Sequence, residues 1–177
     1  IHVAVIVGSY GPFALSMILG FVSLFLMILT NSSNKSIMKL NIKELTLINE
    51  MSLTVGLVML TIGNFLGGMW ANESWGRYWG WDPKETWALI SIMVYAFVLH
   101  MRLIPGLKSR FVYSIASILS FASILMTYFG VNFYLAGLHS YAKDDQQISF
   151  LYSAIALLIV VIMGVLAYPK YKKYLKN

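Results

Sequence analysis

The sequence predicts an all-α fold, a polytopic transmembrane bundle of about five helices with an external tryptophan-rich loop. The first observation is composition: 59% of the 177 residues are hydrophobic and only 11% are charged, whereas soluble domains carry about 25% charged residues. The second is that five apolar stretches reach the roughly 20 residues needed to cross a bilayer. The third is that strand-length alternating segments are absent, which leaves helices to satisfy the backbone in lipid.

Five spans and four connectors account for nearly the whole chain. We expect the spans at residues 1–30, 45–69, 85–103, 111–131 and 148–168. Polar connectors are expected at residues 31–44, 70–84, 104–110 and 132–147. No internal repeat divides them, so residues 1–177 are expected to form a single domain. The chain opens on Ile1, inside an apolar stretch, and we therefore expect it to be a piece of a longer protein.

The positive charges fall on one side of the alternating spans. Ten of the thirteen Lys and Arg residues lie on that side, namely Lys35, Lys39, Lys43, Arg102, Lys108, Arg110, Lys170, Lys172, Lys173 and Lys176. Short connectors rich in Lys and Arg stay in the cytoplasm. The connectors at residues 70–84 and 132–147 are therefore predicted to face outside.

Two classes of function are not expected from this composition. The basic residues are scattered over three short segments, so we do not expect nucleic-acid binding. The sequence contains no cysteine, so this chain builds no disulfide, thiolate metal site or thiol redox centre.

All five tryptophans lie within the eighteen residues 70–87, between two strongly apolar runs. They are Trp70, Trp75, Trp79, Trp81 and Trp87. This cluster is too dense for an ordinary aromatic belt at a membrane interface. It predicts a flat aromatic platform at the membrane surface, suited to a large planar ligand.

Two of the three histidines are predicted to lie on the side of this tryptophan segment. His2 opens the first span at its outer end, and His139 lies in the second outer connector. Neutral imidazole binds haem iron, so the two side chains can supply both axial ligands of a haem on the aromatic platform. Each can instead be an ordinary interfacial histidine. Their common position beside the tryptophan cluster favours ligation.

His100, the third histidine, lies 17 residues after Pro83, or about 25 Å along a helix that rises 1.5 Å per residue. That distance places His100 deep in the third span, toward the cytoplasmic side. An ionisable residue inside a membrane is a candidate for function. Alternatively, His100 and Arg102 only extend to the cytoplasmic interface. Position alone leaves both hypotheses open.

The charged residues around the tryptophans also allow two interpretations. Asp82 is a good N-cap for the third helix and Glu85 complements its dipole, but both carboxylates can also position a ligand or a partner. Arg77 and Lys84 are the cations of the tryptophan loop. They can pair with the propionates of a haem, or with acidic neighbours such as Glu73 and Glu85.

Residues 75–82, Trp-Gly-Arg-Tyr-Trp-Gly-Trp-Asp, resemble the tryptophan-rich WWD motif (WGxxWxWD) of the haem-handling proteins of cytochrome c biogenesis. The continuation Asp-Pro-Lys-Glu-Thr-Trp-Ala-Leu at 82–89 is similar to the CcsA (ResC) branch, the membrane component of system II cytochrome c synthase. The system I proteins CcmC and CcmF share the core and continue differently. The segments around His2, His100 and His139 resemble that family's histidine segments in the same order.

The resemblance covers essentially the whole chain and implies the C-terminal part of a holocytochrome c synthase, a haem lyase. Such a protein moves haem b to the outer face, where cysteines of an apocytochrome c C-x-x-C-H motif form thioether bonds to the haem vinyls. His2 and His139 would be the external axial ligands. His100 would hold haem in transit with a histidine outside this chain. The external haem surface would be shaped by Trp70, Trp75, Trp79, Trp81, Asp82 and Trp87.

The same resemblance implies partners and a location. The partners are apocytochrome c and a CcsB-type protein, fused or separate, together with membrane lipid. The location is the bacterial cytoplasmic membrane with the WWD segment outside; a plastid thylakoid membrane is the alternative. Haem positioning, rather than an acid–base triad, would carry the activity. The competing functions are a haem exporter without ligation activity and a non-catalytic membrane subunit.

Overall fold

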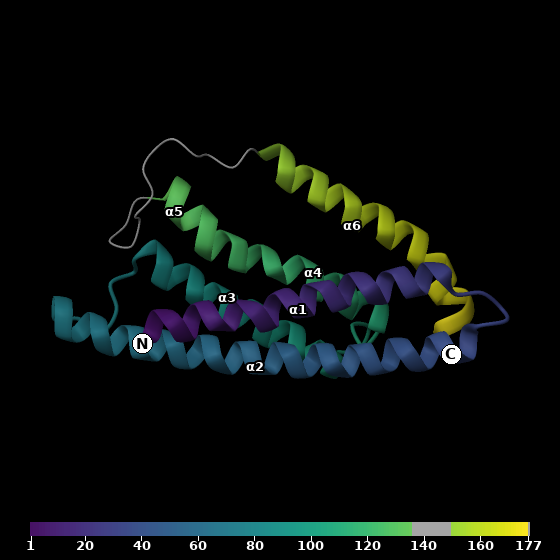
Figure 1. Cartoon of the computed structure of the whole chain (residues 1–177), viewed down its shortest axis with the longest axis horizontal. Coiled ribbons are helices and arrows are strands. Elements are labelled where there is room, and N and C mark those ends of the chain that lie inside the picture. Colours follow the sequence, from purple (N-terminus) through teal and green to yellow (C-terminus); the bar gives the residue numbers. More distant parts are fainter. Residues whose placement is uncertain (136–149, 177) are drawn as a thin grey trace.

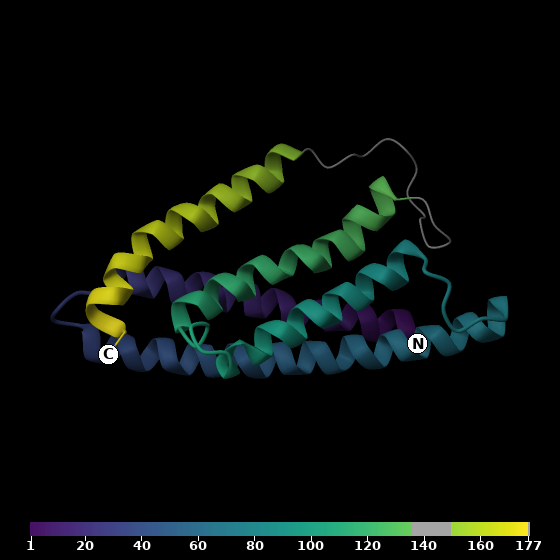
Figure 2. The same cartoon turned by 180° about the vertical axis from the view of Figure 1, so that it is seen from behind.

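The computed structural model describes residues 1–135 and 150–176, and every regular element in them is helical. The α-helices are α1 (His2–Leu29), α2 (Lys35–Trp75), α3 (Pro83–His100), α4 (Arg110–Leu125), α5 (Val131–Tyr134) and α6 (Phe150–Lys170). Three short helices follow on from them, the 3-10 helix η1 (Met101–Leu103) and the π-helices η2 (Met126–Gly130) and η3 (Tyr171–Leu175). The long helices run along the longest axis of the molecule (Figures 1 and 2).

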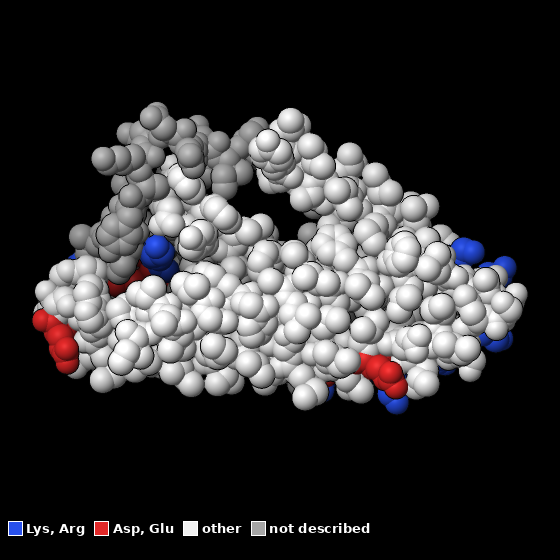
Figure 3. All heavy atoms as spheres, viewed as in Figure 1, with Lys and Arg blue, Asp and Glu red and all other residues white. Residues whose placement is uncertain are grey.

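Five helical stretches of the described chain are long and apolar enough to cross a membrane. They are His2–Leu29, Lys35–Trp75, Pro83–Leu103, Arg110–Phe133 and Leu151–Leu175. Figure 3 shows a broad band without charged residues across the middle of the molecule, with Lys, Arg, Asp and Glu toward its two ends. The predicted all-α bundle of about five spans is confirmed.

The prediction that residues 31–44 form a connector is wrong for most of that range. Helix α2 begins at Lys35 and runs for 41 residues, so only residues 30–34 join it to α1. In that turn Asn34 donates a hydrogen bond from Nδ2 to the Leu29 carbonyl at 3.2 Å. Lys, Leu, Ile and Glu fill the start of α2 and have good to moderate helix propensity, so the helix continues beyond its apolar part.

The expected connectors at residues 70–84 and 132–147 also begin inside helices. Helix α2 continues through Trp75, which leaves irregular backbone only at residues 76–82, and α5 continues through Tyr134. Hydropathy locates the apolar part of a helix, whereas capping residues and propensity decide where the helix ends.

The alternating helices give the molecule two chemically different ends. We call residues 1–2, 70–83 and 131–135 the aromatic end, and residues 30–43, 101–110 and 170–176 the basic end. In Figures 1 and 2 the N-terminus lies toward the aromatic end, and the C-terminus lies beside the α1–α2 turn at the basic end. This arrangement puts the ten Lys and Arg residues singled out above at one end of the bundle.

The centre of the bundle is held by an aromatic stack and by close helix approach. The rings of Phe13 and Tyr95 stack at 3.8 Å with 13° between their planes, joining α1 to α3. A Cβ on Gly56 would lie 2.8 Å from the Phe13 ring, and a Cβ on Gly20 would lie 2.6 Å from Ser117 Oγ. Small residues at these points let α1 approach α2 and α4, as is usual between helices in membranes.

A buried polar cluster ties three helices together at mid-height. Asn49 of α2 is 2% exposed. Ser16 Oγ donates to Asn49 Oδ1 at 2.5 Å, while Asn49 Nδ2 donates to the Ser16 carbonyl at 3.1 Å and to Ser117 Oγ at 3.3 Å. Hydrogen bonds of this kind between membrane helices contribute about 0.6 kcal/mol each, and these three fix the register of α1, α2 and α4.

Helix α6 is the least buried of the five spans, with 17% of its apolar window buried against 50% for the span that contains α4. Its basic-end half packs on α1 and α4 in a cluster that includes Leu24, Phe111, Ala167 and Leu175. Toward its other end α6 diverges from α4 (Figure 1). In the described part of the chain, the aromatic end of the bundle is therefore built by α1 to α5.

Candidate functional site

The backbone of the tryptophan segment leaves α2 through a glycine. Gly76 has φ +70° and its N–H donates to the Asn72 carbonyl at 2.9 Å. Glycine adopts this left-handed conformation without steric cost and commonly ends helices. Tyr78 then folds back on α2, since a Cβ on Gly68 would lie 3.1 Å from the Tyr78 carbonyl oxygen.

Trp81 holds an unusual backbone conformation in the same loop. Its φ is +57°, the one positive φ among the non-glycine residues that the structure describes, and its side chain is 73% exposed. The left-handed region costs an L-residue about 1–2 kcal/mol. Strained residues that expose a large side chain cluster at ligand-binding sites, so Trp81 remains a candidate contact for a ligand.

A capping box anchors the far side of the loop. Asp82 Oδ2 accepts a hydrogen bond from the Lys84 N–H at 3.2 Å. Glu85 Oε2 accepts from the N–H groups of Gly80 at 2.8 Å and Asp82 at 3.3 Å. The predicted N-cap at Asp82 is confirmed, with Pro83 as the first helical residue. Asp82 is only 6% exposed and its carboxylate caps α3, while its part in shaping a haem surface stays a prediction.

His2 lies against Trp70 at the aromatic end, and Trp70 in turn lies against Trp75. The His2 and Trp70 ring centroids are 5.3 Å apart, with 34° between the planes, and Trp70 lies 5.1 Å from Trp75. A Cβ on Gly67 would lie 3.6 Å from His2 Cδ2, so the start of α1 packs directly on the end of α2. The structure thus brings together the predicted ligand His2 and part of the predicted aromatic surface.

The tryptophans do not form one flat platform, and that part of the prediction is wrong. Trp70 and Trp75 meet at 77°, and Trp79 and Trp81 meet at 88° with centroids 5.8 Å apart. Aromatic pairs prefer such edge-to-face contacts to parallel overlap. Two edge-to-face pairs do not share one plane, so a planar ligand would contact separate rings.

The last tryptophan is joined to α4 by a threonine in a π-helix. Thr127 Oγ1 lies 3.2 Å from the Trp87 carbonyl, 2.7 Å from the Ser123 carbonyl and 3.1 Å from Ser91 Oγ. Single-turn π-helices occur often at functional sites. Here η2 brings the Thr127 hydroxyl between α3 and α4, directly below the tryptophan loop. Sequence reasoning missed Thr127.

The two cations of the tryptophan loop are placed differently. Lys84 Nζ donates to Asn132 Oδ1 at 3.1 Å, which links the start of α3 to α5. Arg77 lies over the loop backbone, because a Cβ on Gly80 would lie 2.7 Å from Arg77 Cζ. Whether either cation meets a ligand carboxylate stays a prediction.

His139, the second predicted external ligand, lies outside the described residues. The described chain reaches Leu135 at the end of α5, close to the Lys84–Asn132 contact. Its role as an axial ligand therefore stays a prediction.

His100 is the last residue of α3 and is exposed. Its Nδ1 lies 2.6 Å from the Ala96 carbonyl oxygen. Because a carbonyl only accepts, Nδ1 carries the proton, which leaves Nε2 as the nitrogen through which the neutral ring can bind a metal. His100 lies at the end of α3 that leads into the basic end, while its side of the membrane and its depth stay predictions.

His100 lines a groove of about 700 Å³ between α2 and the end of α3. The lining residues are Leu47, Glu50, Met51, Thr54, Val55, Leu99, His100, Arg102 and Leu103. Sites for ligands of small-molecule size have volumes of about 300–1,000 Å³ and mostly apolar walls. The groove therefore has the size and lining for a large apolar ligand with one histidine beside it.

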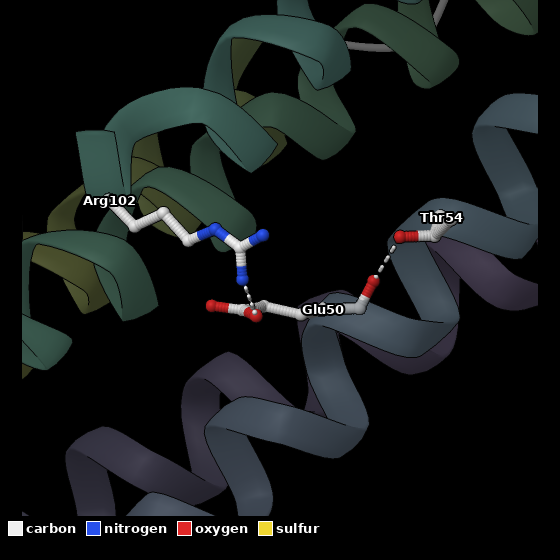
Figure 4. Close-up of polar contacts among 3 residues, drawn as sticks. All are labelled: Glu50, Thr54 and Arg102. Carbon is white, nitrogen blue, oxygen red and sulfur yellow. Dashed lines mark hydrogen bonds and ion pairs between the residues drawn. The ribbon is translucent and has the colours of Figure 1, made fainter. Parts of the chain in front are cut away.

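Glu50 and Arg102 form an ion pair at the rim of this groove, and sequence reasoning missed it. Arg102 Nη1 lies 3.2 Å from Glu50 Oε2, with side-chain exposures of 67% and 22%. Figure 4 shows Arg102 of η1 reaching toward Glu50 on α2, where Thr54 donates to the Glu50 carbonyl at 2.8 Å. Glu50 was a detectable signal, since it is the one acidic residue in the span expected at 45–69.

The fold and these two sites define a polytopic helical membrane protein, with an aromatic site beside a histidine at one end and a histidine-lined groove toward the other. The family model described as cytochrome C assembly protein matches residues 1–139. The chain belongs to this family. The resemblance inferred from the WWD motif is therefore confirmed.

Individual relatives agree with this assignment. Protein NrfI of Wolinella succinogenes is 57% identical over 145 residues, which cover 82% of this chain and 16% of NrfI. The cytochrome c biogenesis protein CcsA of Prochlorococcus marinus (strain AS9601) is 50% identical over 99 residues, or 56% of this chain and 32% of CcsA. CcsA of Synechococcus sp. (strain CC9605) is 46% identical over the same share of each chain. The chain spans about a third or less of the length of these curated relatives.

Proposed function

We propose that this chain is the haem-handling part of a system II cytochrome c synthase. Haem enters at the basic end, passes His100, and rests at the aromatic end between His2 and His139, where it is joined to apocytochrome c. Family membership supports a role in cytochrome c biogenesis. The observation that carries the haem site is the packing of His2 on Trp70, next to Trp75, at 5.3 Å.

The chain's own residues would position the haem. His2 and His139 would keep the iron six-coordinate, and the tryptophan edges would meet the porphyrin while leaving one haem edge open. Glu85 and Asp82 hold the loop backbone, and Thr127 holds the Trp87 carbonyl. Preorganised geometry of this kind lets two reactants meet as if in one molecule.

The reaction itself needs no net oxidation or reduction. The S–H bond of a cysteine in the C-x-x-C-H motif breaks, its sulfur bonds one vinyl carbon, and the proton ends on the other vinyl carbon. The π bond of the vinyl group is consumed. No group of this chain is required to accept or donate the proton permanently, which fits a protein whose task is to hold and orient haem.

The basic end would lie in the cytoplasm and the aromatic end outside, following the excess of Lys and Arg at one end. The membrane would be the bacterial cytoplasmic membrane, or alternatively a plastid thylakoid membrane. A CcsB-type partner, fused or separate, would complete the synthase. The His100 groove would hold haem in transit, since Nε2 of His100 bears the lone pair.

Co-expression of the full-length protein with an apocytochrome c tests the ligase function directly. We expect haem that stays with the cytochrome on a denaturing gel, and loss of that signal when both cysteines of its C-x-x-C-H motif are replaced. Export of haem without a covalent bond to the cytochrome would favour the haem-exporter function. Absence of bound haem in the folded protein would favour a non-catalytic subunit.

A further inference from the structure

A second, smaller pocket lies at the basic end, between α2 and the connector that leads into α4. Its volume is about 190 Å³. Its charged lining residues are Lys43, Glu50, Arg102, Lys108 and Arg110, and Tyr113 also lines it. It adjoins the His100 groove, with which it shares Glu50 and Arg102.

The charge of this pocket favours an anion. Glu50 is its one carboxylate, and Arg102 Nη1 lies 3.2 Å from Glu50 Oε2. That ion pair leaves Lys43, Lys108 and Arg110 as positive charges around a small volume. Like charges gathered around a concave site attract a counter-ion more strongly than the same charges on a flat surface.

A buried hydroxyl in the same lining calls for a hydrogen-bond partner. Tyr113 is 6% exposed, and its hydroxyl oxygen has no hydrogen-bond partner among the residues that the structure describes. Buried polar groups are almost always satisfied, and an exception often marks an unseen ligand or water. Tyr113 lines the pocket, so a phosphate group bound there is the acceptor to which this hydroxyl would turn.

The start of α4 adds a favourable dipole. Arg110, which lines the pocket, is the first residue of α4, and Ser109 caps the helix by accepting from the Val112 N–H at 3.3 Å. The positive end of a helix of 16 residues therefore lies at the pocket. Helix N-termini of this kind bind phosphate groups.

The size and surroundings of the pocket select the ligand. At about 190 Å³ it is smaller than the His100 groove and too small for a porphyrin, but it holds a phosphate group. Beside it on α2 the apolar side chains of Leu47 and Met51 are 51% and 69% exposed, as expected for contact with acyl chains. Basic pockets between membrane helices on the cytoplasmic side bind anionic head groups.

We propose that this pocket binds the phosphate of an anionic phospholipid, with the acyl chains lying along the exposed apolar face of α2. The bound lipid would join α2 to the start of α4 at the end of the bundle where α3 and α4 are linked by a short connector. Leu47 and Met51 also line the His100 groove, so the acyl chains would share that face with haem in transit. The phosphate pocket itself does not depend on the proposed ligase function.

Native mass spectrometry of the delipidated full-length protein tests the proposal. The probes are phosphatidylglycerol, phosphatidylcholine and inorganic phosphate, added separately and in competition. We expect one phosphatidylglycerol to bind at least about tenfold more tightly than phosphatidylcholine, because both lipids carry the phosphate but only choline adds a positive charge that Lys43, Lys108 and Arg110 repel. Lys108→Gln with Arg110→Gln should remove this preference, and Tyr113→Phe should weaken the binding of both lipids without removing a charge.

The matched control is Lys35→Gln with Lys172→Gln, which removes two charges from the basic end outside the pocket lining. An equal loss in this control would overturn the proposal, because it would show diffuse attraction to the whole basic end. Equal binding of both lipids would overturn it as well. Displacement of phosphatidylglycerol by inorganic phosphate at matched concentration would assign the pocket to free phosphate instead of lipid. Tyr113→Phe keeps the test decisive if the double variant fails to fold.

Discussion

The two ends of the bundle each carry a histidine, but they are built on different principles. At the aromatic end His2 packs on Trp70, and a capping box fixes the loop that carries the other tryptophans. Next to the basic end, His100 is exposed beside a groove of about 700 Å³ whose polar lining includes Thr54 and the Glu50–Arg102 ion pair. A fixed, aromatic site suits holding a ligand for chemistry, whereas an open groove suits admitting and releasing it.

The largest effect is expected from removing the ligand at the aromatic end. His2→Gly in the full-length protein should lower the affinity for haem at least about tenfold, because even the groups behind a metal ligand are worth 10–100-fold. Added imidazole should restore part of the bound haem, since it can occupy the place of the missing side chain. The measurement is haem content and the absorption spectrum after purification with and without imidazole.

If a folded His2→Gly protein keeps the wild-type absorption spectrum, His2 is not an iron ligand. Trp70→Phe is the matched control, because it preserves an aromatic ring against position 2 and should leave the ligand in place.

His100→Ala tests the other end and should have the next largest effect. It should reduce haem at the aromatic end several-fold by limiting supply, while leaving the spectrum of the remaining haem unchanged, since the outer ligands are intact. Haem content per protein measures the first effect and the reduced spectrum measures the second. Leu103→Ala, which changes the same groove without touching a ligand, serves as control. If the haem content is unchanged, His100 has no role in haem supply and only extends to the membrane interface.

Asp82→Ala should destabilise the loop by about 0.5–2 kcal/mol, the usual range for losing an N-cap. The Lys84 N–H would lose its acceptor at 3.2 Å. Thermal unfolding in detergent measures the loss, and Asp82→Asn should recover much of it because asparagine also caps helices. Glu73→Ala removes an exposed carboxylate near the end of α2 and should change the melting temperature little. Equal effects of the two alanine variants would contradict the capping role.

Thr127→Val should cost about 1 kcal/mol, because it removes the hydroxyl that lies 2.7 Å from the Ser123 carbonyl, 3.1 Å from Ser91 Oγ and 3.2 Å from the Trp87 carbonyl. We also expect weaker haem retention, as the link between α3 and α4 under the tryptophan loop is lost. Ser120→Ala is the control, since the Ser120 hydroxyl bonds the Ser117 carbonyl of its own helix. If both variants lose haem equally, the link through Thr127 is not specific to the site.

The smallest effect is expected from the ion pair at the groove. Glu50→Gln and Arg102→Gln, alone and combined, should show a coupling energy below about 1 kcal/mol, as is usual for exposed ion pairs. Arg102 is 67% exposed, so salt should reduce the coupling further. A double-mutant cycle by thermal unfolding gives this number. A coupling well above that limit would mean that the basic end is more rigid than its exposure indicates.

Composition and motif were enough to predict the class of fold, because a bilayer admits few structures and hydropathy marks them directly. Asp82 at the start of α3 was predictable from local capping chemistry alone. The extra turns at the start of α2, before residue 45, were missed, since propensity rather than hydropathy decides how far a helix continues beyond the lipid. The perpendicular tryptophan rings were missed because ring angles depend on packing.

Contacts between residues far apart in the sequence could not be predicted. Thr127 meets Trp87 across 40 residues, and Arg102 meets Glu50 across 52. Such pairs depend on which helices are neighbours and on their rotation. Helix neighbours and rotations follow only from the packing of the whole bundle, so they could not be predicted from a single sequence. His2 and the tryptophan segment could be linked, because the alternation of the spans puts both on the same side of the membrane.

The absorption spectrum of the purified full-length protein, wild type beside a variant with both His2 and His139 replaced by alanine, tests the central claim most directly. Our account predicts a reduced spectrum of low-spin haem with two histidine ligands in the wild type and its loss in the variant, while circular dichroism stays the same. The same low-spin spectrum in both proteins would contradict the assignment of these histidines, and a folded wild type without haem would contradict the haem site altogether.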